Sequence, residues 1–420
     1  MIENATKGLL EGRRLLLGIA GGIAACKAVD YSRKLKALGA ELFIVLTQNA
    51  ARFVTPLSVA ALTSSSVHLD MFEPDSSSAM LHIELARKAD LFCILPATAN
   101  TLAKVACGLA DDLLSTLCLS HGRPILLFPS MNPVMWQNPV VQANVRRLKE
   151  AGHKVITPAY GETACGECGE GRLPDWPVVR EAVLKALTPQ TLRDINILIS
   201  AGPTREHIDP VRFISNRSSG RMGYALAQEA ARRGAEVTLV SGPVSLEPPP
   251  GVHVVSVETA SQMQNAMQTL AQEARIIVMT AAVSDYAPIV TAQQKLKKTF
   301  ETLHLELQRN PDILTGLTSS CRPNQFIVGF CAETEALREH ALQKFKAKGV
   351  HLLVANDVSQ KDAGFDVETN RVLLLWSERP REQSGPSLRQ EEIVVKELPL
   401  LPKDRVAQAI WDKVEQLAGL

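Results

Sequence analysis

Short apolar runs alternate with amphipathic stretches along the chain. Residues 15–20 and 41–46 are near-continuous apolar runs, and the stretch from Lys27 to Leu38 between them mixes apolar with basic side chains. Gly39 follows as a helix stop. Because strands that are covered on both faces are apolar throughout, this order predicts a βαβ unit of a parallel sheet.

The same rhythm continues to the C-terminus, with a pause near residues 187–189. It predicts an α/β protein with two Rossmann-like or flavodoxin-like domains, residues 1–189 and 190–420, each a mainly parallel sheet with helices on both faces. The polar stretch 377–392 is expected to be an exposed loop or a hairpin connection. Further strands are expected at 91–95, 124–128, 195–199, 236–240, 252–257, 276–279, 326–330 and 351–355, and helices at 102–119, 223–233, 261–274 and 406–417.

Composition narrows the class of protein. Of 420 residues, 46% are hydrophobic and 21% are charged, which is ordinary globular usage. The 45 basic and 44 acidic residues leave a net charge of +1, so no partnership with nucleic acid or an anionic membrane is expected. No apolar run approaches the roughly 20 residues that span a bilayer. Eight cysteines are too few for a disulfide scaffold and fit a reducing cytosol, which predicts a cytoplasmic protein.

The N-terminal apolar run has a second interpretation. Arg13 and Arg14 precede it and Cys26 follows it, which is also the pattern of a signal peptide with a lipid-accepting cysteine. Because a helical stretch and a second predicted strand follow, the apolar run is better explained as the first third of a βαβ unit.

Three polar loops follow predicted strands of the first half. The loops 20–23, 96–101 and 129–136 would meet at the carboxyl edge of one parallel sheet and form one crevice. Gly21 and Gly22 stand where a strand meets a helix, a place suited to an anion, although a plain turn explains them equally well. The loop is neither a dinucleotide fingerprint nor a P-loop, which disfavours ATP hydrolysis by that motif.

Three further residues of the first half are candidates for chemistry. His82 lies in a stretch with a helical pattern and is either a structural histidine or a group that titrates near neutral pH. Cys165 and Cys168 have the spacing of half a zinc or redox site, but no second cysteine pair follows at zinc spacing. The glycines around them predict a mobile loop that acts as a lid carrying a reactive thiol.

The second half repeats the arrangement with different loops. Ser218, Ser219 and Gly220 leave N–H groups free at a helix start, flanked by the basic Arg217 and Arg221, which favours an anion. The loop is too long for a dinucleotide fingerprint, so an ordinary NAD site is not expected.

A lysine cluster adds a second candidate anion site in this half. Lys295, Lys297 and Lys298 form either a solvated charged face or, together with Lys344 and Lys348, the surroundings of a triphosphate.

The motifs at 21–25, 96–100, 129–132 and 164–172 are similar to those of the flavin-dependent cysteine decarboxylases. Nearly the whole chain resembles the bifunctional phosphopantothenoylcysteine decarboxylase/phosphopantothenate–cysteine ligase family, with the motifs in the same order. The resemblance implies that FMN oxidises the substrate's cysteine side chain to a thioaldehyde, which accepts the electrons left on the neighbouring carbon when CO₂ departs. It implies a catalytic His82, an Asn132 that binds the substrate carboxylate, and a Cys165 that donates a proton. The implied cofactor contacts are Gly21, Gly22, Ile23, Thr47, Ala97, Thr98 and Asn100.

For the second half, the resemblance implies that CTP activates 4′-phosphopantothenate as an acyl-cytidylate, from which the amine of cysteine displaces CMP. Asn216 would handle the acyl-cytidylate with help from Arg212, and Lys295 would take part in catalysis. Mg²⁺ is expected with the nucleotide, without ligands that spacing can identify, and a homo-oligomer with flavin sites between subunits is implied. The implied CTP contacts are Met279, Thr280, Ala281, Asp285, Lys295, Pro311, Asp312, Ile313, Leu314, Phe330, Lys344 and Lys348.

The chain departs from the family pattern at three positions. Ala20 stands where a Ser or Thr is expected, Cys26 replaces an aromatic residue, and Cys168 is an added thiol that would permit an inactivating disulfide with Cys165. Two rival functions are a two-domain nicotinamide oxidoreductase and a non-catalytic regulatory protein on a flavoprotein scaffold. The missing fingerprints weigh against the first, and the joint presence of the candidate catalytic residues weighs against the second.

Overall fold

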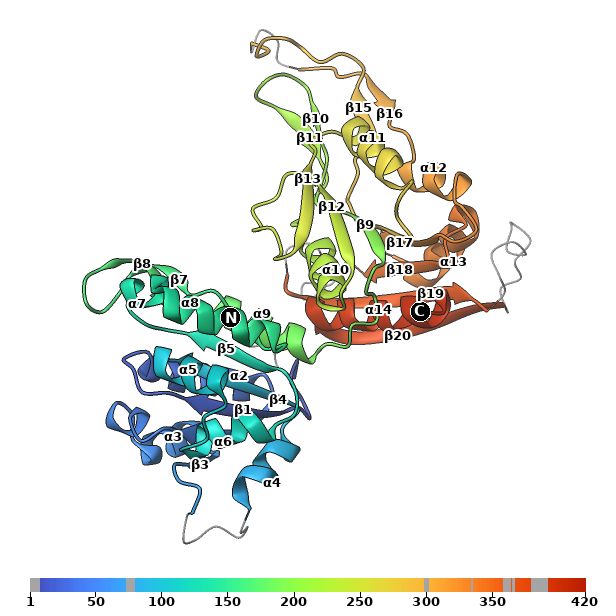
Figure 1. Cartoon of the computed structure of the whole chain (residues 1–420). Coiled ribbons are helices and arrows are strands. Elements are labelled where there is room, and N and C mark those ends of the chain that lie inside the picture. The colour runs from blue at the N-terminus through green and yellow to red at the C-terminus, as the bar shows by residue number, and fades with distance from the viewer. Residues whose placement is uncertain are drawn as a thin grey trace. The chain divides into compact units, whose positions relative to one another are not determined.

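The computed structural model describes residues 8–72, 80–297, 302–333, 335–357, 364, 367–378 and 392–420. The chain divides into two compact units, Ile2–Thr188 and Pro189–Leu420, which Figure 1 colours from blue to green and from green to red. Each unit is an α/β structure built around one large sheet. Among the described residues, no helix is both long and apolar enough to cross a membrane.

A six-stranded parallel sheet forms the centre of the N-terminal unit, in the order β3-β2-β1-β4-β5-β6. The chain reverses its direction of winding between β1 and β4, and ligands of such sheets bind at this switch point. The strands are β1 (Arg14–Ile19), β2 (Glu41–Leu46), β3 (Ser66–His68), β4 (Leu91–Ala97), β5 (Ile125–Pro129) and β6 (Lys154–Val155).

Side-chain alternation explains why helices cover both faces of this sheet. Along β1, Leu15 and Leu17 belong to one buried cluster and Leu16 to another on the opposite face, as the two-residue period of a strand requires. The covering helices are α2 (Ala25–Ala37), α3 (Pro56–Thr63), α4 (Leu81–Lys88), α5 (Ala99–Cys107), α6 (Leu113–Ser120), α7 (Pro133–Gln137), α8 (Pro139–Glu150) and α9 (Trp176–Leu187).

The prediction of one long helix over 102–119 is wrong. Gly108 adopts the left-handed conformation and ends α5, and the Asp112 side chain then caps α6 in a reciprocal capping box with Ser115. A glycine in this conformation is a common helix end, and aspartate is a strong N-cap. The two helices therefore meet at a break that apolar periodicity did not reveal.

The C-terminal unit contains an eight-stranded sheet in the order β13-β12-β9-β14-β17-β18-β19-β20. Its first six strands pair in parallel, and β19 and β20 add an antiparallel edge. The strands are β9 (Asn196–Ala201), β12 (Glu236–Ser241), β13 (Val252–Ser256), β14 (Ile276–Met279), β17 (Phe326–Glu333), β18 (Leu352–Asp357), β19 (Thr369–Ser377) and β20 (Ile393–Pro402). The helices are α10 (Arg221–Arg232), α11 (Ala260–Leu270), α12 (Ile313–Ser319), α13 (Leu337–Lys348) and α14 (Lys403–Ala418).

Three small antiparallel pairs project from the large sheets. They are β7 (Ala159–Glu162) with β8 (Cys168–Arg172), β10 (Arg205–His207) with β11 (Phe213–Ser215), and β15 (Tyr286–Pro288) with β16 (Leu307–Arg309).

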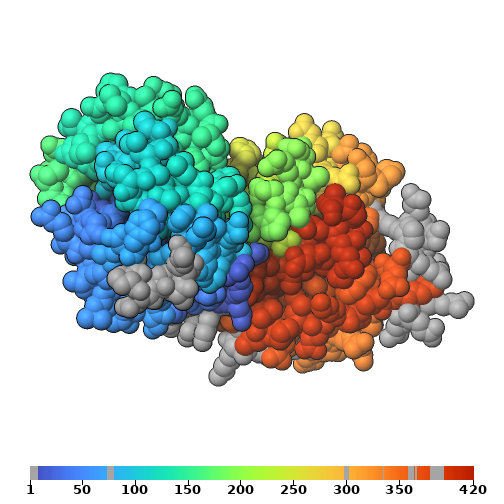
Figure 2. Space-filling model, turned by 60° about the horizontal axis from the view of Figure 1, so that its bottom comes forward, coloured from blue at the N-terminus to red at the C-terminus, as the bar shows by residue number. Residues whose placement is uncertain are grey.

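The C-terminal helix is fixed by one large side chain. Trp411 of α14 is fully buried, and its ring N–H donates to the carbonyl of Leu226 in α10 at 3.0 Å. The red segment in Figure 2, β20 with α14, forms much of the surface of this unit on the face shown. Of the predicted polar stretch 377–392, residues 379–391 lie outside the described residues. The pairing of Ser377 with Ile393 on either side agrees with a hairpin connection.

Candidate active sites

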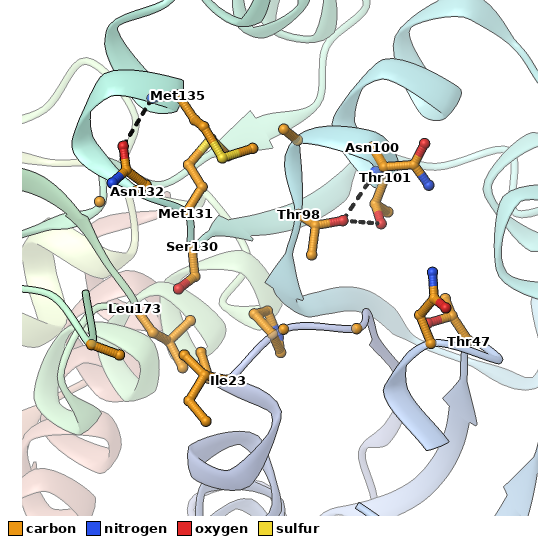
Figure 3. A pocket seen from close by; sticks show the side chains of 18 of the residues that line it. Ile23, Thr47, Thr98, Asn100, Thr101, Ser130, Met131, Asn132, Met135 and Leu173 are labelled. Atoms are coloured by element: carbon orange, nitrogen blue, oxygen red, sulfur yellow. Dashed lines mark hydrogen bonds between the residues drawn. The ribbon is translucent and has the colours of Figure 1, made fainter. Parts of the chain in front are cut away.

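The N-terminal unit has a cavity of about 990 Å³ at the carboxyl ends of β1, β4 and β5. All three loops predicted to converge contribute to its lining, as Figure 3 shows with Ile23, Thr98 and Asn132. Of the predicted cofactor contacts, six line the cavity: Gly21, Gly22, Ile23, Thr47, Thr98 and Asn100. Ala97 is fully buried in the core beside them.

The walls of this cavity fit a flavin nucleotide. A Cβ at position 21 would lie 2.4 Å from the Cβ of Asn49, so only glycine allows the loop after β1 to pass there. The 13-residue helix α2 that follows has no side-chain cap at its N-terminus, and the N–H groups of Ala25, Cys26 and Lys27 donate to the carbonyls of the preceding turn. What this helix start offers an anion is therefore the positive end of the helix dipole. Ile23, Met131 and Leu173 supply apolar surface for a flat ring system.

Asn132 is oriented by the helix that it begins. Its Oδ1 caps α7 by accepting from the backbone N–H groups of Val134 (2.8 Å) and Met135 (3.4 Å). The Nδ2 group therefore faces the β7–β8 hairpin, where it donates to Cys165 Sγ at 3.3 Å and to the Glu167 carboxylate. The cap therefore fixes the orientation of the Asn132 amide, with its N–H donors directed toward the candidate thiol.

The segment predicted as a mobile lid is a β-hairpin with a tight turn. Cys165 lies in the turn, where the Thr163 N–H donates to the Glu167 carbonyl at 2.8 Å. The strand β8 lies against the loop after β5, since the Met131 N–H donates to the Gly171 carbonyl at 2.9 Å. A Cβ at position 171 would lie 2.3 Å from the Met131 carbonyl oxygen, so glycine is required for this approach. The hairpin thereby holds Cys165 at the rim of the cavity.

Hydrogen bonds make the Cys165 thiol more acidic than usual. The Thr163 hydroxyl at 3.0 Å contributes most to lowering the pKa of Cys165, followed by the Asn132 amide and the Glu167 backbone N–H, while the Glu167 charge opposes them. Cys93 and Cys118 show the opposite effect, since burial raises the pKa of each thiol. Of these three thiols, Cys165 is thus the one whose reactive thiolate form the surrounding contacts favour.

Replacing Thr163 with Val should move the ionisation of Cys165 to higher pH, because the thiolate loses its strongest hydrogen bond. Alkylation of Cys165 by iodoacetamide, followed across pH by peptide mass spectrometry, would then show a raised midpoint. Thr163→Ser keeps the hydroxyl and should retain the wild-type midpoint. An unchanged midpoint in Thr163→Val would contradict the assignment.

Cys168 should make peroxide inactivation of decarboxylation reversible by dithiothreitol. Peroxide would oxidise the Cys165 thiolate to a sulfenic acid with release of hydroxide, and the Cys168 thiol would then displace water to form the disulfide. Both thiols are exposed and free in the structure. In Cys168→Ser the dithiothreitol-reversible part of the activity loss should shrink, because a sulfenic acid without a thiol partner is oxidised further to the irreversible sulfinic acid. Equal reversible loss in both proteins would exclude the disulfide.

His82 lies on α4 and is not among the residues that line the cavity of its own chain. Its buried Nδ1 has no hydrogen-bond partner among the described residues.

Sequence reasoning also missed three cavity residues near the break between α5 and α6: Lys104, Asp112 and Ser115. Lys104 forms ion pairs with Asp111 and Asp112, each at 2.7 Å. In the sequence, Gly108 and the pair Asp111 and Asp112 could have indicated that one helix ends here and another begins.

The C-terminal unit has its own cavity, of about 640 Å³, at the carboxyl ends of β14, β17 and β18. The Asn216–Gly223 segment and the residues after β14 both contribute to its lining. Of the predicted CTP contacts, eleven line it: Met279, Thr280, Ala281, Asp285, Pro311, Asp312, Ile313, Leu314, Phe330, Lys344 and Lys348.

Ion pairs hold the two lysines of α13 in place. Lys348 pairs with Asp312, the N-cap of α12, and Lys344 pairs with Glu333 at 2.6 Å. Burial alone would raise the pKa of Asp312, but hydrogen bonds from Lys348 and from the Thr315 N–H outweigh it and lower that pKa. Burial acts to lower the pKa of Lys344, and its bond to Glu333 outweighs this and raises it. The raised pKa keeps Lys344 positive near neutral pH, and its place in the cavity lining suits an anionic ligand.

Asn216 joins two of the cavity's loops. Its Nδ2 donates to the Val283 carbonyl at 2.9 Å. Asn310 makes the equivalent link from the β16 side, by donating to the Ser284 carbonyl at 2.9 Å. The sequence reasoning missed Asn310 and also Asn356, whose buried Oδ1 at the end of β18 has no partner among the described residues. The position of both asparagines at the end of a strand could have indicated that they line the site.

Arg212 and Lys295 lie apart from this cavity. The carboxylate of Asp209 is fully buried and bonds the Arg212 guanidinium at 2.5 Å and the Leu296 N–H at 3.1 Å. Arg212 also donates to the Leu296 carbonyl at 2.9 Å. This network ties the segment of Lys295 to the β10–β11 hairpin, and neither cation lines the cavity. Lys298 lies outside the described residues.

Comparisons with known proteins agree with both cavities. Residues 3–188 match the family model described as Flavoprotein, and residues 192–417 match that of the DNA/pantothenate metabolism flavoprotein C-terminal domain. The chain is 41% identical over 412 residues to the coenzyme A biosynthesis bifunctional protein CoaBC of Vibrio vulnificus (strain CMCP6), covering 98% of this chain and 99% of that one. It is 40% identical over 409 residues to CoaBC of Escherichia coli (strain K12), covering 96% and 97% of the two chains.

Two solved structures are also similar. The C-terminal domain of CoaBC shares 39% identity and covers 54% of this chain and 97% of its own, with a TM-score of 0.43. The FMN-dependent cysteine decarboxylase SpaF shares 32% identity and covers 42% and 98%, with a TM-score of 0.38.

The fold, the first cavity and the matched domains define a two-domain α/β flavoprotein. The chain belongs to the family of coenzyme A biosynthesis bifunctional proteins. It is therefore a bifunctional enzyme with a decarboxylase and a ligase activity, as the sequence motifs predicted, and the two rival functions are set aside.

Proposed function

We propose that residues 190–420 join cysteine to 4′-phosphopantothenate at the expense of CTP and that residues 1–189 decarboxylate the resulting phosphopantothenoylcysteine. The observation that carries this proposal is that each unit has its own cavity, with the motif residues of one reaction in each. The amide must form first, because the carboxylate that is lost belongs to the added cysteine. We also propose that the enzyme works in the cytoplasm on small molecules and without nucleic acid or membrane partners.

In the first unit, Asn132 binds the substrate carboxylate through its Nδ2 group. FMN, when bound, would take two electrons from the substrate's cysteine side chain, so that the resulting thioaldehyde accepts the electrons left behind by CO₂, and would return the two electrons to the enethiolate that decarboxylation leaves. Gly21, Gly22 and Ile23 would hold the phosphate end of the cofactor at the start of α2, where the positive end of the helix dipole lies. Cys165 delivers a proton to the decarboxylated product, and its position in the hairpin at the rim supports that role.

His82 acts from a second copy of the chain. The cavity lining of one chain leaves His82 out, although the family resemblance gives it a catalytic role. A homo-oligomer with the flavin site between subunits would bring the His82 of one copy to the Asn132 and Cys165 of another. Size determination of the purified protein by light scattering tests this, and a monomer that decarboxylates its substrate would refute it.

In the second unit, Lys344 and Lys348 bind the triphosphate. Their charges stabilise the pyrophosphate that leaves when the 4′-phosphopantothenate carboxylate attacks CTP. Asn216 then holds the acyl-cytidylate while the amine of cysteine displaces CMP. Arg212 and Lys295 stay predictions, since both lie off the cavity.

Mg²⁺ would enter with the nucleotide. The described residues contain no group of three or more His, Cys, Asp or Glu side chains placed to hold a metal ion. Magnesium commonly keeps several waters and binds through the phosphates of its substrate, which fits a site without a protein cage.

Mass spectrometry of the products tests the whole proposal. The purified protein is mixed with CTP, Mg²⁺, cysteine and 4′-phosphopantothenate, and its visible absorbance is recorded for bound flavin. Phosphopantothenoylcysteine should appear first, followed by 4′-phosphopantetheine, with CMP and pyrophosphate in equal amounts. A colourless protein that takes up no flavin and does not consume CTP would refute it.

A further inference from the structure

Both N–H groups of Asn132 are already used when no substrate is present. Its Oδ1 is held by the start of α7, so the amide cannot turn around. A primary amide has two N–H donors, and those of Asn132 go to Cys165 Sγ and to the Glu167 carboxylate. A substrate carboxylate can therefore reach this amide only by displacing one of the two.

Glu167 is the partner that can leave. Its side chain is exposed and is not among the residues that line the cavity, while its backbone is fixed because the Glu167 carbonyl accepts from the Thr163 N–H at 2.8 Å. The carboxylate can swing into solvent by side-chain rotation without opening the turn. Cys165, in contrast, is held by Thr163 as well as by Asn132.

We propose that Glu167 is a positioning residue whose carboxylate occupies, on the amide of Asn132, the place that the substrate carboxylate takes during decarboxylation. This inference rests on the proposed function of the N-terminal unit. One carboxylate replaces another on the same donor, so Asn132 is never left unpaired. The net charge beside Cys165 also stays the same before and after binding.

The exchange explains how the site distinguishes substrate from product. The substrate has a carboxylate that can take the place of Glu167, whereas the decarboxylated product has none. Once CO₂ has left, Glu167 returns to Asn132 and no contact on this amide retains the product. Glu167 thus weakens substrate binding but leaves product binding unaffected.

The test compares Glu167→Gln and Glu167→Ala with the wild type as flavin-loaded full-length proteins. Glutamine keeps the size but is a neutral acceptor, and hydrogen bonds to neutral groups are weaker than charge-assisted ones. The KM for phosphopantothenoylcysteine should fall about fivefold in Glu167→Gln, while the inhibition constant of 4′-phosphopantetheine stays at the wild-type value. Glu170→Gln removes the same charge from the same hairpin at a residue that neither contacts Asn132 nor lines the cavity, and its amide oxygen can still accept from the Trp136 ring N–H, so the ratio of KM to the inhibition constant should not change.

A second measurement needs no turnover. In the substrate-free protein, loss of the Glu167 charge should move the alkylation of Cys165 to lower pH, because that charge disfavours the thiolate. An unchanged or raised KM in both variants, an equal fall in the product inhibition constant, or an unmoved alkylation profile would each overturn the inference. Failure of the proposed function would show separately, as a wild-type protein that does not decarboxylate its substrate.

Discussion

Asn132→Asp should lower the rate of decarboxylation by about a thousandfold, because a lost charge-assisted hydrogen bond and a new like-charge contact together cost about 4 kcal/mol. The wild-type amide turns its Nδ2 donors toward the hairpin. An ionised aspartate has acceptors only. It would repel both Glu167 and the substrate carboxylate. Ligation in the other unit should keep its wild-type rate.

The variant should still fold, because aspartate is as good an N-cap as asparagine. Its remaining oxygen can accept from Val134 and Met135 as Oδ1 does now. Asn138→Asp is the matched control: Asn138 caps the next helix by accepting from Val140 at 2.9 Å, and it does not line the cavity. Release of CO₂ is measured on flavin-loaded protein of each variant. If Asn132→Asp decarboxylates at the wild-type rate, Asn132 does not bind the substrate carboxylate.

The cavity of the first unit could be located from the sequence because of one regularity. Near-continuous apolar runs indicate parallel strands, and loops that follow such strands meet at one edge of the sheet. This reasoning brought Gly21, Thr98 and Asn132 together in the first unit, whereas Asn216 and Asp285, which line the second cavity, were named from the family resemblance. The α/β fold and the family are confirmed, whereas the individual catalytic roles stay predictions.

The features that the sequence concealed depend on local caps or on distant contacts. The end of α5 at Gly108 depends on a backbone conformation that apolar periodicity does not report. The β7–β8 hairpin forms because its glycines allow close approach to the loop at Met131, a contact between segments about forty residues apart. The anchoring of the Lys295 segment by the buried Asp209 is likewise a tertiary contact without a pattern in the sequence.

Asn216→Asp should reduce amide formation by about a thousandfold, again from the loss of a donor and the gain of a negative charge beside an anionic ligand. The wild-type Nδ2 donates to the Val283 carbonyl and so joins the loop before α10 to the loop after β14. A carboxylate at this position would face that carbonyl oxygen without a hydrogen to share. It would also stand next to the phosphate of the acyl-cytidylate.

Asn196→Asp provides the matched control in the same unit. Asn196 is an exposed asparagine at the start of β9 whose Nδ2 also donates to a backbone carbonyl, that of Glu273 at 3.5 Å, and it does not line the cavity. It should ligate at the wild-type rate, and Asn216→Asp should keep its flavin and decarboxylate added phosphopantothenoylcysteine normally. Product masses and visible absorbance measure both activities in one sample. If Asn216→Asp instead loses both reactions while it stays folded, the two units do not divide the work, because a change confined to one cavity would then control the chemistry of the other.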